Sequence, residues 1–346
     1  MQRVLSNIGL VIECRDFRVP LTSWNPLLEK SLMSSASPVG GGERARIIVY
    51  TKRDLGPTGS ESSTADGGGP SGSEIVNRLA AFHQRQGHAS AVVFLGKGGA
   101  AGGQKLLEVV KRVAREHDSL TGLRALVVGM PNAGKSTLLN RLRSQGMGLG
   151  KAAKTGSQPG VTRKLGTPVR IVASSGGGEG ETKGAGGFGE GVFIMDTPGV
   201  FVPYVSDAES MLKLALVGCV KDGLVPLLTV ADYLLFHLNL HDPSLYATYC
   251  DEPTNDVHEF LTGVARRTGK LVRGGEPSLE AAADWIVKAW RNGELGRFVL
   301  DEVNETTLRA AVKASAEPPM SLNQARKKEK ELRKVRNEAK RLAAQG

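Results

Sequence analysis

The sequence predicts an α/β domain, built on a mostly parallel sheet with helices on both faces, followed by a small all-helical domain. Two observations predict this architecture. In the first part of the chain, short apolar segments of strand length alternate with helical segments, which is the pattern of a parallel sheet covered on both faces. After Pro203 the strand-like segments stop and only helical periodicity continues.

The individual elements follow from these patterns. The expected strands are 10–14, 46–51, 90–95, 123–129, 168–173 and 192–196. The helices expected between them each carry one apolar stripe that can lie on the sheet, and they are 73–86, 104–116 and 135–144. The helices expected in the second domain are 207–220, 226–240, 255–268, 278–292 and 302–314.

These elements predict three parts. We expect a first domain over residues 1–202, a helical domain over 203–318 and a basic helical tail over 319–346. Two segments, near 56–73 and 174–191, are rich in Gly and Ser and lack the apolar residues needed for packing. They are expected to be flexible surface insertions.

Composition restricts the classes of protein. The chain has 346 residues, 40% of them hydrophobic, which is typical of a soluble globular protein. No apolar run approaches the ~20 residues of a bilayer-spanning helix, so no transmembrane segment is expected. The three cysteines show no CxxC spacing, which favours core residues in a reducing compartment over a disulfide framework. No targeting peptide is visible before the first strand, and the abrupt start raises the alternative of a missing leader.

The charge favours a polyanionic partner. A net charge of +10 suits RNA or an acidic membrane surface, with plain solubility as the alternative. The segment 321–344 carries nine Lys and Arg against three Glu. We expect it to form a charged helix that either contacts RNA or is merely solvated, and the overall charge favours RNA.

A phosphate-binding loop is predicted at residues 129–136. The sequence GMPNAGKS satisfies GxxxxGK[ST], follows an expected strand and opens an expected helix. Backbone amides of this loop are expected to surround the phosphates, with Lys135 on the β and γ oxygens and Ser136 on Mg²⁺. The nucleotide-binding residues expected in this loop and the helix that follows are Asn132, Ala133, Gly134, Lys135, Ser136 and Thr137.

Two downstream motifs are expected to complete the phosphate site. Asp196 begins DTPG at the end of an apolar strand, where its carboxylate can hold Mg²⁺ through a water. The Gly199 amide of the same motif can bond the γ-phosphate. Between the two motifs, Thr162 of QPGVTR can complete the Mg²⁺ shell when the γ-phosphate is present.

The base is predicted to be guanine. Thr51, Lys52, Arg53 and Asp54 form TKRD directly after a strand, at the sheet edge of the phosphate loop. Asp54 can accept hydrogen bonds from guanine N1–H and the exocyclic amine, while Lys52 lies over the purine plane. Thr51 takes a place more often held by Asn. The turn near residues 95–97 is expected to offer a backbone amide to the guanine oxygen, so the expected ligands are GTP and GDP with Mg²⁺.

The order of these motifs is rotated, because TKRD precedes the phosphate loop, PGVT and DTPG. Together with the opening VIECRDFRVPLTSWNP, this order resembles the circularly permuted GTPases of ribosome assembly. Within them it is most similar to the group of bacterial ribosome biogenesis GTPase A and mitochondrial ribosome-associated GTPase 1. The resemblance covers nearly the whole chain, except that a PGHM-like motif found near the start of members is absent.

The resemblance implies action on the large ribosomal subunit, through its rRNA and proteins, with docking in the GTP state and release after hydrolysis. The sequence CRDFRVPL and the low-complexity insertions favour the mitochondrial branch. The resemblance therefore implies a location in the mitochondrial matrix, with association with the inner membrane as an option. The cytoplasm is the alternative location. Because DTPGV leads through Phe201 into the helical domain, nucleotide state is expected to tilt that domain, with the segment around Gly199 as the bistable element.

Hydrolysis is expected to be slow without a partner. Val200 and Phe201 follow DTPG, where many GTPases carry a Gln that orients water. The resemblance implies a K⁺ ion instead, placed by Asn132 and by carbonyls before Thr162, with Lys135 and Gly199 completing the catalytic set. We expect K⁺ and the ribosomal subunit to raise turnover.

Two other readings stay open. In the first, the chain is an RNA-binding module in which GTP is a structural lock and hydrolysis is incidental. In the second, a peripheral membrane GTPase is held by the basic tail, although that helix lacks a bulky apolar face. Whichever function holds, we expect the chain to be a monomer.

Three further features are given structural roles. His237 and His241 are expected on an ordinary helix surface rather than on a metal. Trp285 and Trp290 are expected to pack between helices. Arg15 and Asp16 are expected to pair structurally, with a role near the ribosome-facing surface as the alternative.

Overall fold

The computed structural model describes residues 7–25, 44–58, 70–117, 120–153, 166–174, 189–199 and 207–316, together with eight residues between 324 and 338. Several expectations lie outside these residues. They concern Thr162, Val200 and Phe201, most of the two Gly/Ser-rich insertions, and most of the basic tail.

The six predicted strands are all present and form one sheet. They are β1 (Leu10–Asp16), β2 (Ala45–Thr51), β3 (Ala91–Phe94), β4 (Leu123–Gly129), β5 (Val169–Val172) and β6 (Val192–Asp196), in the order β3-β2-β1-β4-β6-β5. All neighbouring pairs are parallel except β5 with β6, which are antiparallel. The sheet is therefore mostly parallel, with one antiparallel edge strand.

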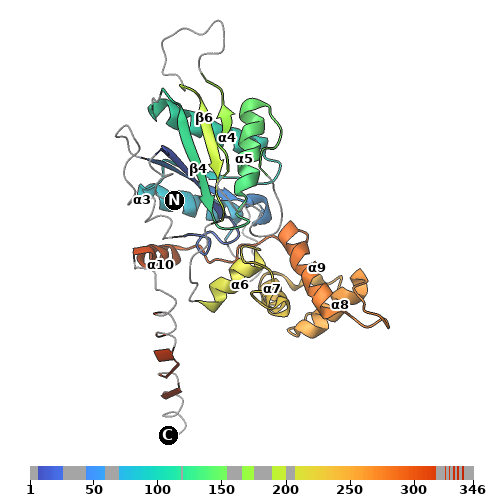
Figure 1. Ribbon diagram of the computed structural model, residues 1–346. Coiled ribbons are helices and arrows are strands. Elements are labelled where there is room, and N and C mark those ends of the chain that lie inside the picture. The colour runs from blue at the N-terminus through green and yellow to red at the C-terminus, as the bar shows by residue number, and fades with distance from the viewer. Residues whose placement is uncertain are drawn as a thin grey trace.

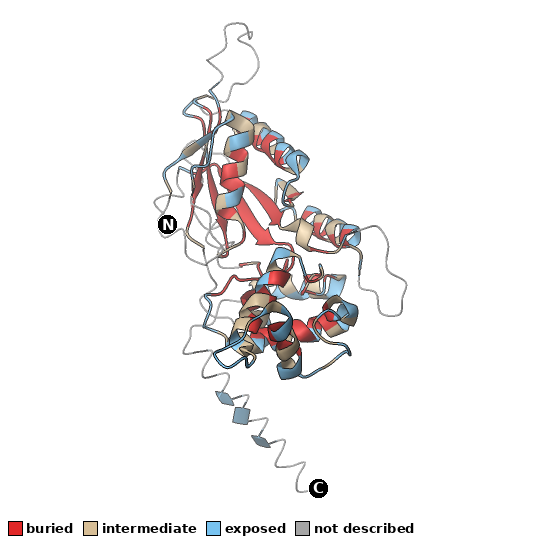
Figure 2. Ribbon diagram, turned by 90° about the vertical axis from the view of Figure 1, so that its right-hand side faces the viewer, coloured by how far each residue is buried: buried red, intermediate tan, exposed pale blue. Residues whose placement is uncertain are grey.

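Helices cover both faces, as predicted (Figure 1). The helices of the first part are α3 (Gly72–Gln86), α4 (Ala100–His117) and α5 (Lys135–Met147). Successive strand residues point to opposite faces. Accordingly, Ile47 and Val49 of β2 pack in the cluster that includes α4 and α5, whereas Ile48 and Tyr50 pack with α3. Figure 2 shows the buried residues concentrated on the strands and the inner sides of the helices.

The helical part has its own core. It consists of α6 (Ala208–Leu216), α7 (Leu227–His241), the short 3-10 helix η2 (Pro243–Tyr246), α8 (Val257–Thr268) and α9 (Leu279–Asn292). Trp290 is 2% exposed in this core, and Trp285 packs against it partly buried, which confirms their packing role. Val19 and Met130, from the loops after β1 and β4, belong to the same cluster. The helical part is thus joined to the edge of the sheet at which these strands end.

The last helix of the continuously described chain, α10 (Glu305–Ala316), packs elsewhere. Its Leu308, with Val303 just before it, lies in the cluster of Phe82 and Ile75 from α3, on the sheet. Residues predicted inside the 203–318 domain therefore return to the sheet, as Figure 1 shows for α3 and α10. The domain boundaries themselves stay predictions.

His237 departs from the prediction. It is only 6% exposed, not on a helix surface, and its ring stacks 5.9 Å from that of Phe298. Burial lowers the pKa of His237 to about 4. The side chain therefore behaves as a neutral core residue.

The sheet topology places the site. From β1 the chain adds β2 and β3 on one side, and then β4 starts on the other side of β1. Ligands of open α/β sheets bind at such a switch point, outside the carboxyl ends of the strands. The strands β1, β2, β4 and β6 end at Asp16, Thr51, Gly129 and Asp196, so the predicted motifs gather at one edge. In the part of the chain that the structure describes, no helix is long and apolar enough to cross a membrane.

Candidate nucleotide-binding site

The phosphate loop joins β4 to α5 and requires its glycines. Gly129 has φ 141°, and a Cβ atom on it would lie 2.3 Å from the Cys14 carbonyl oxygen. Gly134 has φ 81° at the N-cap of α5, a conformation that other residues adopt only with strain. Asn132 is left-handed too, with φ 55°. The loop thus opens onto a helix N-terminus, which favours an anion.

Lys135 lies inside this loop. Its side chain is buried, and Nζ donates a 2.7 Å hydrogen bond to the Met130 carbonyl oxygen. Burial lowers the pKa of Lys135. A bound polyphosphate would strongly stabilise the charged form of Lys135, because the anion offsets the loss of hydration that burial imposes on the ammonium group.

The two predicted Mg²⁺ ligands of the described chain meet. Ser136 Oγ donates a 2.5 Å hydrogen bond to Asp196 Oδ2, and the register of β4 and β6 pairs Val127 with Asp196. Thr197 Oγ1 holds the start of DTPG by donating to the Val127 carbonyl oxygen at 2.8 Å. Hydroxyl and carboxylate oxygens suit Mg²⁺, so this pair fits the ion.

Gly199 lies against the phosphate loop. A Cβ atom on it would come within 2.6 Å of the Pro131 backbone nitrogen, so only glycine fits without a shift. This contact brings the end of DTPG to the first turn of the loop, in the neighbourhood that a γ-phosphate contact requires.

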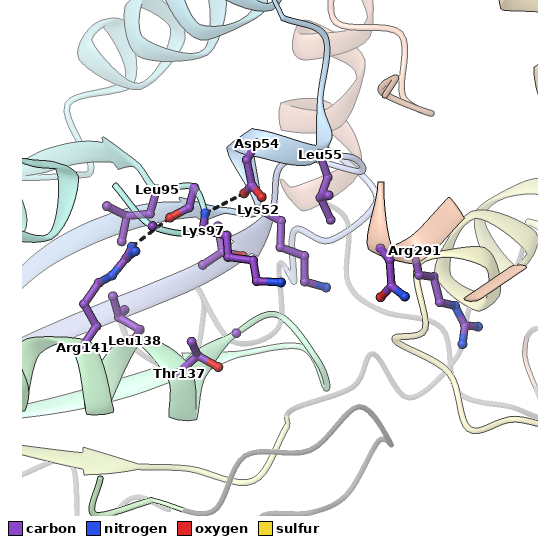
Figure 3. Close-up of a pocket in the computed structure, with 14 residues that line it drawn as sticks. Lys52, Asp54, Leu55, Leu95, Lys97, Thr137, Leu138, Arg141 and Arg291 are labelled. Atoms are coloured by element: carbon purple, nitrogen blue, oxygen red, sulfur yellow. Dashed lines mark hydrogen bonds between the residues drawn. The ribbon is translucent and has the colours of Figure 1, made fainter. Parts of the chain in front are cut away.

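A cavity of about 350 Å³ lies beside the loop, between TKRD, the turn at 95–98 and α5 (Figure 3). Its lining residues are Thr51, Lys52, Asp54, Leu55, Leu95, Gly96, Lys97, Gly98, Gly134, Thr137, Leu138, Arg141, Arg291 and Asn292. The cavity is therefore lined by all three TKRD residues that were predicted to bind the nucleotide, Thr51, Lys52 and Asp54, together with Gly134 and Thr137.

The turn at 95–98 is fastened to both sides of this cavity. Asp54 Oδ1 accepts a 2.8 Å hydrogen bond from the Lys97 amide, and the Arg53 amide donates to the Leu95 carbonyl oxygen at 2.9 Å. Arg141 of α5 donates to the Gly96 carbonyl oxygen at 3.0 Å. Figure 3 shows the first and third of these bonds. The turn thus lies where a base-contacting amide is expected.

Thr51 links the base side to the phosphate side. Its hydroxyl lies 2.9 Å from the Ala133 carbonyl oxygen and 3.1 Å from that of Arg15, and can donate its proton to either. A threonine therefore reaches the phosphate loop from the position more often held by Asn.

Lys52 is oriented by a residue that sequence reasoning had not assigned to the site. Its backbone is left-handed, with φ 58°, and Nζ lies 2.8 Å from Asp16 Oδ2. Asp16 is fully buried and also accepts two hydrogen bonds from the Arg18 guanidinium. Burial alone would raise the pKa of Asp16, but the charges of Arg18 and Lys52 hold it well below its usual range. From sequence we expected Arg15 to pair with Asp16, but in the structure Arg15 pairs with Glu13, at 2.7 Å.

The helical part meets the site at the C-terminus of α6, where the carbonyls have no partners within the helix. Arg291 donates to the carbonyl oxygens of Ala215 and Leu216 at 2.8 and 2.9 Å. Arg18 donates to that of Val217 at 3.3 Å, and Asn132 Nδ2 to that of Gly218 at 2.7 Å. These contacts connect α6 to α9, to the loop after β1 and to the phosphate loop.

Comparisons with known proteins agree with this geometry. Residues 124–259 match the family described as "50S ribosome-binding GTPase". "Mitochondrial GTPase 1" of Schizosaccharomyces pombe is 33% identical over 319 residues, covering 89% of this chain and 87% of that protein. The chain belongs to the family of circularly permuted GTPases that includes mitochondrial GTPase 1.

Other members of the family are similar over the same extent. "Mitochondrial ribosome-associated GTPase 1" of Mus musculus is 30% identical, covering 87% of this chain and 86% of that protein. "Ribosome biogenesis GTPase A" of Bacillus cereus is 27% identical, with coverage of 87% and 88%. The structure titled "Crystal structure of GNP-bound YlqF from T. maritima" shares the fold, with a TM-score of 0.51 and 22% identity, covering 88% of this chain and 96% of that one.

Proposed function

We propose that this chain binds and hydrolyses GTP as an assembly factor of the large ribosomal subunit in mitochondria. The observation that carries the proposal is the convergence of Asp54, Lys135 and the Ser136–Asp196 pair on one sheet edge. The subunit and the organelle are supported by the names of relatives, among them mitochondrial ribosome-associated GTPase 1 and ribosome biogenesis GTPase A.

In the proposed reaction each residue has a defined task. Backbone amides of 132–137 and the Lys135 ammonium hold the β and γ oxygens and disperse the charge that develops on them. Ser136 and Asp196 hold Mg²⁺, with Thr162 expected as a third ligand, and the ion neutralises the phosphates. Gly199 lies beside the loop, and its amide can donate a hydrogen bond to the γ-phosphate, which is lost after hydrolysis.

We infer that Asn132 helps to place a K⁺ ion near the phosphates. Its Nδ2 donates to the Gly218 carbonyl oxygen, which orients the side chain, and the oxygen of a carboxamide is the atom that binds a cation. Turnover is expected to be several-fold faster in K⁺ than in Na⁺, and Asn132→Ala should remove the difference. Equal rates in the two salts would exclude the ion.

A ribosomal role is tested by nucleotide-dependent binding. Large mitochondrial subunits and their precursors are sedimented with the protein in a non-hydrolysable GTP analogue or in GDP. We expect cosedimentation with the analogue, release in GDP, and subunit-stimulated hydrolysis, with rRNA as the docking surface. Association that does not depend on the nucleotide would contradict the proposed cycle. In a separate measurement by solution scattering, we expect the helical domain to change its orientation between the GTP and GDP states.

One alternative has its own support. Val200 and Phe201 stand where many GTPases carry a water-orienting Gln, which suits an RNA-binding module that uses GTP as a structural lock. Under this alternative the subunit would bind the GTP form without raising turnover. Stimulated hydrolysis therefore separates the two functions.

A further inference from the structure

The cavity that contains Asp54 is not formed by the sheet domain alone. Arg291 and Asn292, the last two residues of α9, line it together with Leu55. Figure 3 shows Arg291 beyond Lys52 and Leu55, on the side of the cavity away from Thr137. The helical domain thus contributes a wall to the base-side cavity.

The end of α9 is held closely against the base-reading turn. Gly293 terminates the helix with φ 83°, and a Cβ atom on it would lie 2.8 Å from Leu55 Cδ2. Leu55 belongs to the turn η1 (Arg53–Leu55), which presents Asp54. The contact fixes Asn292, one residue before Gly293, next to that turn.

The two wall residues differ in what they can offer a ligand. The Arg291 guanidinium is occupied by the carbonyl oxygens of Ala215 and Leu216. Asn292 is exposed, and the hydrogen bond described for its amide is a long one, 3.4 Å to Glu294 Oε1. Its carboxamide can therefore turn to a ligand at little cost, both donating and accepting.

The part of the nucleotide that Asn292 can contact follows from what the other residues of the site bind. Asp54 takes the Watson–Crick edge of guanine, and the loop around Gly134 takes the phosphates, which leaves the ribose hydroxyls for the outer wall. We propose that Asn292 binds the ribose of the guanine nucleotide, so that the helical domain forms part of the nucleotide site. This proposal rests on the proposed function, in which the cavity takes GTP or GDP.

The test compares Asn292→Ala with Lys288→Ala, a matched substitution one helical turn earlier. Lys288 is exposed, pairs with Asp284 and does not line the cavity. Calorimetric titration with GDP and with 2′,3′-dideoxy-GDP measures the ribose contact as a double-mutant cycle. Asn292→Ala should weaken GDP binding about fivefold to tenfold, the size of one to two neutral hydrogen bonds. Lys288→Ala should leave it unchanged.

The cycle is decisive because dideoxy-GDP should bind Asn292→Ala and the wild type almost equally. GDP affinity of Asn292→Ala within twofold of the wild type would overturn the proposal, and so would an equal loss for both nucleotides. A wild-type chain that binds neither nucleotide would count against the proposed function instead.

Discussion

Asp54→Asn is the sharpest test of base recognition, because it replaces one carboxylate oxygen by an amino group. The Asn oxygen can keep the 2.8 Å bond from the Lys97 amide, so the turn at 95–98 should stay in place. The new NH₂ group would face the N1–H and amine donors of guanine. Donor then opposes donor, and one charge-assisted bond is lost.

The expected loss can be estimated from these two effects. A hydrogen bond to a charged group contributes roughly 1.5–3 kcal/mol, and an unsatisfied donor costs about 1–3 kcal/mol. Their sum, about 2.5–6 kcal/mol, weakens GDP binding roughly 60-fold to 20,000-fold. Xanthosine diphosphate carries a carbonyl in place of the guanine amine, so it should bind the variant better than GDP does.

Calorimetry with both nucleotides measures this exchange of specificity. The matched control is Asp284→Asn, on an exposed carboxylate of α9 that pairs with Lys288 and does not line the cavity. GDP affinity of Asp54→Asn within about tenfold of the wild type, or no preference for xanthine, would refute the assignment of Asp54 to the base edge.

Three further outcomes are expected. Ser136→Ala should leave GDP binding without Mg²⁺ unchanged but abolish most of the Mg²⁺-dependent gain, measured by titration with and without the ion; an undiminished gain would exclude Ser136 as a ligand. Glu13→Gln should cost about 3–5 kcal/mol in unfolding free energy, because it removes the buried carboxylate that pairs with both Arg15 and Arg46. Asp301→Ala should cost about 2–4 kcal/mol by denaturant unfolding, because the backbone amides that it binds lose their acceptor, and Asp301→Asn should recover part of this.

The Glu13 effect also has a defined pH dependence. Burial raises the pKa of Glu13, but the charges of Arg15 and Arg46 outweigh it and lower the pKa from 4.5 to about 2. Because the folded pKa lies below the unfolded one, the stabilisation is complete above pH 4.5 and is lost as the pH falls towards 2. The difference between wild type and Glu13→Gln should therefore narrow in this window, and a constant difference would contradict the ion-pair account.

Much of the fold was predictable because its signals are local. The alternation of apolar segments located all six strands, and the phosphate loop was found because GxxxxGK[ST] lies within eight residues between a strand and a helix. The direction of β5 was not predictable, since apolar content does not distinguish a parallel from an antiparallel edge strand. The position of α10 was missed for a similar reason: an apolar stripe does not reveal which core it covers.

The parts of the site that sequence could not supply are long-range contacts. Asp16 and Lys52 are 36 residues apart, and Arg18 reaches Val217 across 199 residues. Neither pair forms a spacing that marks a motif. The RD pair after the first strand was a visible signal, because a carboxylate at a strand end near TKRD can orient its lysine, but the partner could not be chosen from sequence.

The helical domain is attached to the sheet domain on both sides of its core. The described chain enters at α6 after the DTPG motif and leaves through Leu300, whose amide donates to the Arg18 carbonyl oxygen at 2.8 Å, and through Asp301, which binds Leu21 and Thr22. The Arg18–Val217 and Asn132–Gly218 bonds add contacts between these two connections, so the helical part is held to the sheet along its whole inner side. Under the proposed switch, a displacement of Gly199 on loss of the γ-phosphate would therefore have to break or carry along several of these contacts, and not a single hinge.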